Sequence, residues 1–248
     1  MGLEHVRRTY EDFGREDPFF AVLSDRSRRG GKWDPKAFFA TGREEIDRAL
    51  AELRRLGVMP DMGRALDFGC AVGRLTQALA RHFDDVVGVD IAQSMLDVAR
   101  EYNEHGERVT YALNTVPDLE RFEAGSFDFV YSNITLQHIP RASAEAYVSE
   151  FFRLLRPGGV ALFQVPDGPD VPLGSFRERL TSFWRGPVRR FSKRIRGKAP
   201  VEIHYVPRPV VEASVRRAGC ELVDARDLSD KPRRWTAFRY CVRRPIAP

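Results

Sequence analysis

Glycines and carboxylates within residues 65–100 follow a pattern that could bind a nucleoside. An apolar run leads into a turn that contains Gly69 and Gly73, and a second apolar run, 86–89, ends at Asp90. Glycines at such a turn let the backbone approach a ligand closely. A carboxylate at the tip of the next strand can accept hydrogen bonds from both hydroxyls of a ribose. The spacing therefore predicts an adenosine site.

The spacing of the glycines distinguishes this turn from a dinucleotide site. Dinucleotide-binding turns usually carry G-x-G-x-x-G, whose third glycine lets helix and strand pack closely around a pyrophosphate. Here three residues separate Gly69 from Gly73. The turn D-F-G-C-A-V-G, 67–73, resembles motif I of the class I S-adenosylmethionine-dependent methyltransferases, [DE]-x-G-x-G-x-G, with Ala71 at the position of the middle glycine.

Three later segments resemble the same family in the same order. DIAQSMLDVAR, 90–100, looks like the segment that binds ribose and adenine. SFDFVYSNITLQHIP, 126–140, is similar to the fourth strand and the turn that meets the methyl acceptor. FFRLLRPGGVALFQVP, 151–166, is similar to the next helix and the fifth strand. The resemblance covers residues 60–170 and implies S-adenosylmethionine as cofactor and S-adenosylhomocysteine as product.

The resemblance also implies which residues hold the adenosine part of the cofactor. Asp90 would bind the ribose diol, and Ile91 and Met95 would sandwich the adenine. Asn114 would accept a hydrogen bond from the adenine amino group, with Thr115 or Val116 as the neighbouring alternatives. Each of these residues could instead have a structural role. Asp90 could cap a helix, Ile91 and Met95 could be core residues at helical spacing, and Asn114 could be a turn residue.

The methionine part of the cofactor would be held by the first turn and by the end of the fourth strand. Asp67 would favour its ammonium group, and Asn133 would meet the methionine portion. The turn residues expected to contact the cofactor are Gly69, Cys70, Ala71 and Gly73. All these positions follow predicted strands, and ligands of open α/β sheets bind beyond the carboxyl ends of the strands.

Two histidines are candidates for a general base. Methyl transfer requires that acceptor, methyl and sulfur lie in line and that water is excluded. A base is needed only when an acceptor hydroxyl must lose its proton, and a neutral imidazole can take it. His138 follows the fourth strand, and His204 precedes a predicted helix, while a structural role for His138 in the short helix is the alternative. No histidine and carboxylate grouping has metal-ligand spacing, which predicts no metal.

Periodicity predicts a helical cap, 1–60, in front of an α/β domain, 61–248. Strands that alternate with helices predict a doubly wound, Rossmann-like and mostly parallel sheet. The resemblance implies seven strands, the last of them antiparallel. The predicted strands span 65–68, 86–89, 109–113, 127–132, 160–165, 221–225 and 235–242.

A basic helical insertion or lid is predicted after the fifth strand, at 167–205. Its central segment, 174–198, contains nine Lys and Arg residues and one Glu, a charge of +8, whereas the whole chain carries +5. Apolar residues recur there every three or four positions, which predicts amphipathic helices. Such a segment could cover the site, bind an anionic or lipid-linked acceptor, or lie on an anionic membrane surface.

Composition favours a cytoplasmic enzyme. The 248-residue chain has no apolar run near the length of about 20 residues that a membrane span needs. The N-terminal residues are charged throughout and lack the apolar centre of a signal peptide. Three scattered cysteines, Cys70, Cys220 and Cys241, fit a reducing compartment.

The function implied by the resemblance is methylation of a small molecule. O-methylation of a sugar, polysaccharide or secondary metabolite is the first choice, and N-methylation is the alternative. A nucleic-acid methyltransferase would use the basic segment, but S-N-I-T, 132–135, lacks the prolines of N-P-P-[YFW], which disfavours a nucleic-acid partner. A non-catalytic protein that binds S-adenosylmethionine is the other alternative, and Ala71 is its only hint.

Overall fold

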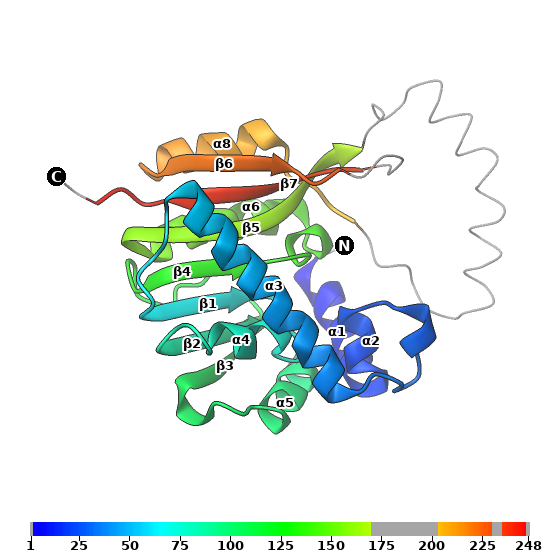
Figure 1. Ribbon diagram of the computed structural model, residues 1–248. Helices are drawn as coiled ribbons and strands as arrows, with labels where there is room; N and C mark the ends of the chain where they lie inside the picture. The colour runs from blue at the N-terminus through cyan, green and yellow to red at the C-terminus, as the bar shows by residue number, and fades with distance from the viewer. Residues whose placement is uncertain (1, 170–202, 230–234, 247–248) are drawn as a thin grey trace, which may run out of the picture.

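The computed structural model describes residues 2–169, 203–229 and 235–246. These residues form a seven-stranded sheet in the order β3-β2-β1-β4-β5-β7-β6 (Figure 1). The strands are β1 (Arg64–Phe68), β2 (Asp85–Asp90), β3 (Val109–Leu113), β4 (Phe127–Ser132), β5 (Leu155–Pro169), β6 (Glu221–Asp227) and β7 (Trp235–Arg243). Strands β1 to β5 run parallel, and β7 pairs antiparallel with both β5 and β6. The doubly wound fold with an antiparallel last strand is confirmed.

Helices precede the first strand and cover both faces of the sheet. The α-helices are α1 (Leu3–Glu16), α2 (Pro18–Val22), α3 (Pro35–Leu56), α4 (Arg74–Leu79), α5 (Gln93–Glu101), α6 (Arg141–Leu154) and α8 (Arg208–Arg217). Short 3-10 helices are η1 (Arg26–Arg28), η2 (Gly106–Arg108) and η3 (Leu136–His138). Figure 1 shows α3 crossing the front of the sheet and α6 lying behind it.

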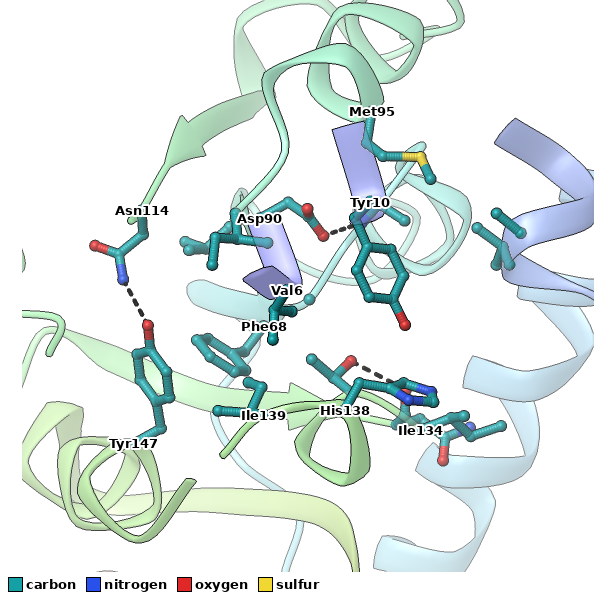
Figure 2. A pocket seen from close by; sticks show the side chains of 18 of the residues that line it. Val6, Tyr10, Phe68, Asp90, Met95, Asn114, Ile134, His138, Ile139 and Tyr147 are labelled. Carbon is teal, nitrogen blue, oxygen red and sulfur yellow. Dashed lines mark hydrogen bonds between the residues drawn. The ribbon is translucent and has the colours of Figure 1, made fainter. Parts of the chain in front are cut away.

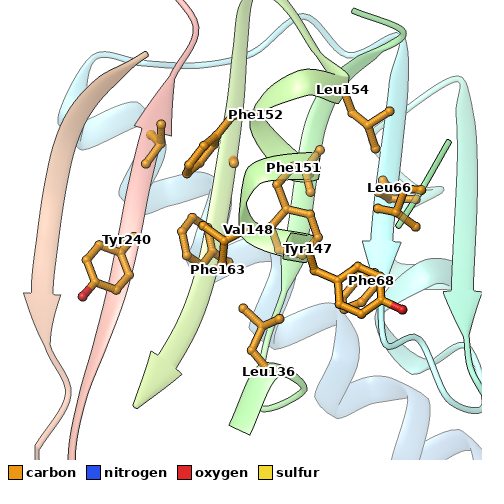
Figure 3. Packing of buried hydrophobic residues seen from close by; sticks show 14 of the residues in the cluster. Leu66, Phe68, Leu136, Tyr147, Val148, Phe151, Phe152, Leu154, Phe163 and Tyr240 are labelled. Atoms are coloured by element: carbon orange, nitrogen blue, oxygen red, sulfur yellow. The ribbon is translucent and has the colours of Figure 1, made fainter. Parts of the chain in front are cut away.

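Strand alternation divides the core into two layers. In β1, Leu66 and Phe68 belong to the cluster beneath α6 and α8, whereas Ala65 belongs to the cluster beneath α3 and α4. Side chains of successive strand residues point to opposite faces, so this division follows directly from the sequence order. Figure 3 shows the first layer, where Phe151 of α6 meets Phe163 of β5 with ring centroids 5.8 Å apart.

The fifth strand is longer than the sequence predicted. It begins at Leu155 rather than Val160, because Leu155 already pairs with Phe127 of β4 across an irregular register. The R-P-G-G segment, 156–159, therefore belongs to the strand. Gly159 is required there, since a Cβ atom would lie 2.9 Å from the carbonyl oxygen of Arg156.

The basic segment 174–198 lies outside the described residues, as does most of the predicted insertion. Within the part of the chain that is described, no helix is both long and apolar enough to cross a membrane.

Candidate functional site

A cavity lies at the carboxyl ends of β1, β2 and β4, where α1 and η3 close over it (Figure 2). Including the open space at its mouth, it measures about 820 Å³. The predicted site residues that line it are Gly69, Ala71, Asp90, Ile91, Met95, Asn114, Asn133 and His138. Asp67, Cys70, Gly73, Thr115 and His204 are not among its lining residues. The strand ends thus gather most, but not all, of the predicted side chains at one place.

The carboxylate of Asp90 is held by backbone donors. Its Oδ2 accepts from the N–H of Ala71 at 2.9 Å, and its Oδ1 accepts from the N–H of Ala92 at 2.9 Å. Burial raises the pKa of the Asp90 carboxyl, while both N–H groups act in the opposite direction. The side chain is 9% exposed and faces the cavity. An acceptor group is therefore fixed at the end of β2, with lone pairs left for a ligand diol.

Positive backbone φ angles mark the cavity wall. Among the described residues other than glycine, Ala71 (φ +46°) and Ile134 (φ +60°) have a positive φ angle. Both line the cavity. The left-handed conformation is unfavourable for residues with a Cβ atom, and strained positions of this kind cluster at binding sites. Glycine is required at Gly69, where a Cβ would lie 2.2 Å from the side chain of Thr135. This conformation explains why motif I prefers glycine where this chain has Ala71.

Asp67 lies beneath the turn rather than in the cavity wall. Its side chain is 1% exposed, and its Oδ2 accepts a hydrogen bond from Thr76 of α4 at 2.7 Å. Burial raises the pKa of Asp67 to about 7. Cys70 is also buried, and burial raises the pKa of its thiol well above the usual range. Both side chains shape the turn from within.

The amide of Asn114 is oriented by its neighbours. Its Nδ2 donates to the carbonyl oxygens of Val116 and Asp118, each at 2.9 Å, and to the hydroxyl of Tyr147 at 3.2 Å (Figure 2). The amide oxygen is therefore the atom that can accept from a ligand. The neighbouring Thr115 is exposed.

Helix α1 supplies cavity residues that the sequence reasoning missed. Leu3, Val6 and Tyr10 line the wall opposite the strand ends. Their spacing of three and four positions is the helical signal that could have identified them. Figure 2 shows Tyr10 beside His138, and their ring centroids are 6.0 Å apart.

A buried carboxylate fastens α1 to the helix that follows β2. Glu11 accepts from the backbone N–H groups of Gln93 at 2.8 Å and Ser94 at 3.1 Å. These are the first N–H groups of α5, which lack partners inside the helix and favour a negative charge. Gly14 packs directly on Ser94, because a Cβ there would lie 2.3 Å from its Oγ. The contact holds α1 over the cavity.

The two candidate bases lie on neighbouring segments. His138 lines the cavity at the end of η3, and its Nε2 is 3.0 Å from Nε2 of Gln137. The backbone N–H of His204 donates to the carbonyl of Gln137 at 2.8 Å, so the segment before α8 lies against η3. Only His138 of the two reaches the cavity wall. Among the described residues, no group of three or more His, Cys, Asp or Glu side chains could hold a metal ion.

Sequence comparison identifies a known domain in this region. Residues 65–159 match a family model described as a methyltransferase domain. Trans-aconitate 2-methyltransferase of Variovorax paradoxus (strain S110) is 32% identical over 144 residues, 56% of this chain and 52% of that protein. A ubiquinone biosynthesis O-methyltransferase of Xanthomonas axonopodis pv. citri (strain 306) is 38% identical over 145 residues, 56% of each protein. The chain thus spans about half the length of these curated relatives.

Solved structures share the fold at low sequence identity. Magnesium protoporphyrin IX methyltransferase from Synechocystis PCC 6803, with bound S-adenosylhomocysteine, has a TM-score of 0.62 at 19% identity, covering 97% of this chain and 99% of that one. The [4+2]-cyclase SpnF has a TM-score of 0.57 at 17% identity, covering 81% of each chain. Proteins named for two different reactions therefore share this architecture.

Proposed function

Residues 65–159 belong to the class I S-adenosylmethionine-dependent methyltransferase family, and we propose that this protein transfers a methyl group from that cofactor to an oxygen atom of a small molecule. One observation carries the proposal. The glycine turn, the fixed carboxylate of Asp90 and the imidazole of His138 converge on one cavity at the switch point of the sheet. Ligands of open α/β sheets bind at this point.

The proposal places the adenosine part of the cofactor against β2 and β3. Asp90 accepts from the ribose hydroxyls, and a charged acceptor makes stronger hydrogen bonds than a neutral one. Ile91 and Met95 contact the adenine, and Asn114 accepts from its amino group through the amide oxygen. The support is that all four side chains line the cavity. Thr115, which is exposed, is the weaker alternative.

The methionine end then lies along the turn after β1 and beside Asn133. The backbone of Gly69 and Ala71 meets it, since both residues line the cavity. Cys70 and Gly73 shape the turn from behind. Asp67 supports the turn from beneath through its hydrogen bond with Thr76.

The chemistry asked of the side chains is modest. When bound, the cofactor supplies a methyl group that its sulfonium makes electrophilic. The protein aligns the acceptor oxygen with that methyl, while α1 excludes water. As the new O–CH₃ bond forms and the C–S bond breaks, neutral His138 takes the proton of an acceptor hydroxyl. A carboxylate acceptor has no proton to lose and needs no base.

Two acceptor chemistries deserve the first tests. One curated relative is named as an O-methyltransferase and the other for trans-aconitate, a carboxylate. Neither is named for a sugar or polysaccharide, so these acceptors rest on the sequence resemblance alone. An anionic or lipid-linked acceptor, or contact with a membrane surface, rests on the +8 charge of residues 174–198. A cytoplasmic location rests on the scattered cysteines.

The test is a screen of acceptors that follows release of S-adenosylhomocysteine. Phenols, carboxylic acids including trans-aconitate, sugars, lipid-linked glycans and RNA form its arms, and calorimetry with S-adenosylmethionine runs beside it. Turnover with a hydroxyl or carboxylate acceptor supports the proposal. Cofactor binding without turnover in any arm favours a different use of the fold, for which SpnF is the precedent. Absence of cofactor binding contradicts both.

A further inference from the structure

Glu45 of α3 joins the helical cap to the turn after β4. Its Oε1 accepts hydrogen bonds from Nδ2 of Asn133 at 2.6 Å and from the hydroxyl of Tyr131 at 3.0 Å. Its Oε2 accepts from Arg74 of α4 at 2.7 Å. The guanidinium of Arg74 is itself buried, and the side chain of Glu45 is 21% exposed. Three donors therefore converge on one carboxylate.

This arrangement fixes which way the amide of Asn133 faces. A carboxylate has no hydrogen to donate, so the nitrogen of the amide must be the atom that faces Glu45. The orientation of an Asn side chain is determined by such a network. Asn133 lines the cavity, and no described residue donates to its Oδ1. The amide atom left for a ligand is an oxygen, which can only accept.

Glu45 does not line the cavity, and of its three hydrogen-bond partners only Asn133 does. We propose that Glu45 is a positioning residue, which makes Asn133 an acceptor for the ammonium group at the methionine end of the cofactor. This inference rests on the proposed function. The Arg74 ion pair keeps the carboxylate in place.

Replacing Glu45→Gln should reverse the polarity of Asn133. Arg74 can only donate, so the oxygen of the new amide turns to Arg74 and its nitrogen turns to Asn133. Asn133 then presents its oxygen to that nitrogen and its own NH₂ group to the cavity. The NH₂ group of Asn133 and the bound ammonium would then be two donors that face each other. We expect the affinity for S-adenosylhomocysteine to fall about tenfold, the size of one lost charged hydrogen bond.

The matched probe is 5′-deoxy-5′-methylthioadenosine, which has the same nucleoside thioether but no amino-acid end. Its affinity should be equal in the wild type and in Glu45→Gln. The double variant Glu45→Gln with Asn133→Asp exchanges the two groups, so that an acidic oxygen again faces the ammonium. It should bind S-adenosylhomocysteine within about threefold of the wild type. Asn133→Asp alone places two carboxylates side by side and should bind it less well.

Calorimetry with both probes on the four proteins gives a decisive result. Loss of S-adenosylhomocysteine affinity in each single variant, recovery in the double variant and constant methylthioadenosine affinity support the inference. Unchanged affinity in Glu45→Gln, an equal loss for both probes, or no recovery in the double variant overturns it. A wild type that binds neither probe instead contradicts the proposed function itself, so the two failures are distinguishable.

Discussion

Asp90 accepts a hydrogen bond from the backbone N–H of Ala71 at 2.9 Å, which ties the end of β2 to the turn after β1. The same carboxylate accepts from Ala92 at the start of α5. One side chain therefore organises the turn and remains an acceptor in the cavity. Both functions depend on two oxygens that carry negative charge.

Asp90→Ala should lower the affinity for S-adenosylmethionine by at least about tenfold, because charged hydrogen bonds to the ribose are lost and the turn loses its anchor. Asp90→Asn keeps one acceptor oxygen but not the charge, so its affinity should lie between those of the wild type and Asp90→Ala. Isothermal titration calorimetry measures all three proteins. Equal affinities would contradict the contact between Asp90 and the ribose.

The positive φ angle of Ala71 predicts what happens when the middle glycine of motif I is restored at this position. A residue with a Cβ pays about 1–2 kcal/mol for the left-handed conformation, while glycine adds about 0.4–1 kcal/mol of chain entropy to the unfolded state. Ala71→Gly should therefore raise the free energy of unfolding by up to about 1.6 kcal/mol, the difference between these ranges, without lowering cofactor affinity. Ala71→Val, which is β-branched, should lower both. Urea denaturation and calorimetry check this pair, and a glycine variant that binds less well would be the contrary result.

The strand ends could be predicted from sequence because each polar site residue follows an apolar run. Asp90 and Asn133 both follow such runs, and both reach the cavity. Asp67 was expected at the cofactor, but it points to the α4 face, as its alternation with Phe68 requires. Glu45 could not be found in this way, because its contact with Asn133 joins residues 88 positions apart. No local pattern encodes such a contact.

Glu11 should control how readily α1 leaves the cavity. Glu11→Ala removes the acceptor for two N–H groups of α5, a loss of about 1–3 kcal/mol for a buried group. Hydrogen exchange should accelerate in residues 3–16 and in the first turn of α5, and cofactor dissociation should become faster. The matched control is Glu4→Ala on the same helix, whose carboxylate pairs only with exposed Arg7 and Arg8 among the contacts described. Equal exchange in both variants would mean that Glu11 does not fasten α1.

The buried carboxyl of Asp67 predicts a pH dependence of stability. Burial raises its pKa from 3.8 to about 7, so the folded protein keeps a proton that the unfolded chain releases. The bound proton adds to the free energy of unfolding, and this contribution is complete below pH 3.8 and is lost as the pH rises through about 7. The free energy of unfolding falls by no more than about 1.4 kcal/mol per pH unit over this range. In Asp67→Asn the amide oxygen can still accept from Thr76, but the side chain no longer titrates, so this pH dependence of the free energy of unfolding should disappear. Urea midpoints from pH 4 to 8 compare the two proteins, and parallel curves would contradict the raised pKa.

His138→Ala should lower turnover about 100- to 10,000-fold with a hydroxyl acceptor and leave cofactor affinity unchanged, since a general base acts only on the proton of the acceptor. His138→Gln keeps a polar side chain of similar reach but cannot take the proton, so it should be equally slow. A carboxylate acceptor needs no base, and both variants should methylate it at the wild-type rate. His204→Ala separates the two candidates, because His204 does not line the cavity and its contact with η3 is made by the backbone. If His204→Ala is the slow variant instead, the segment before α8 supplies the base, and His138 packs against Tyr10 as a wall of the cavity.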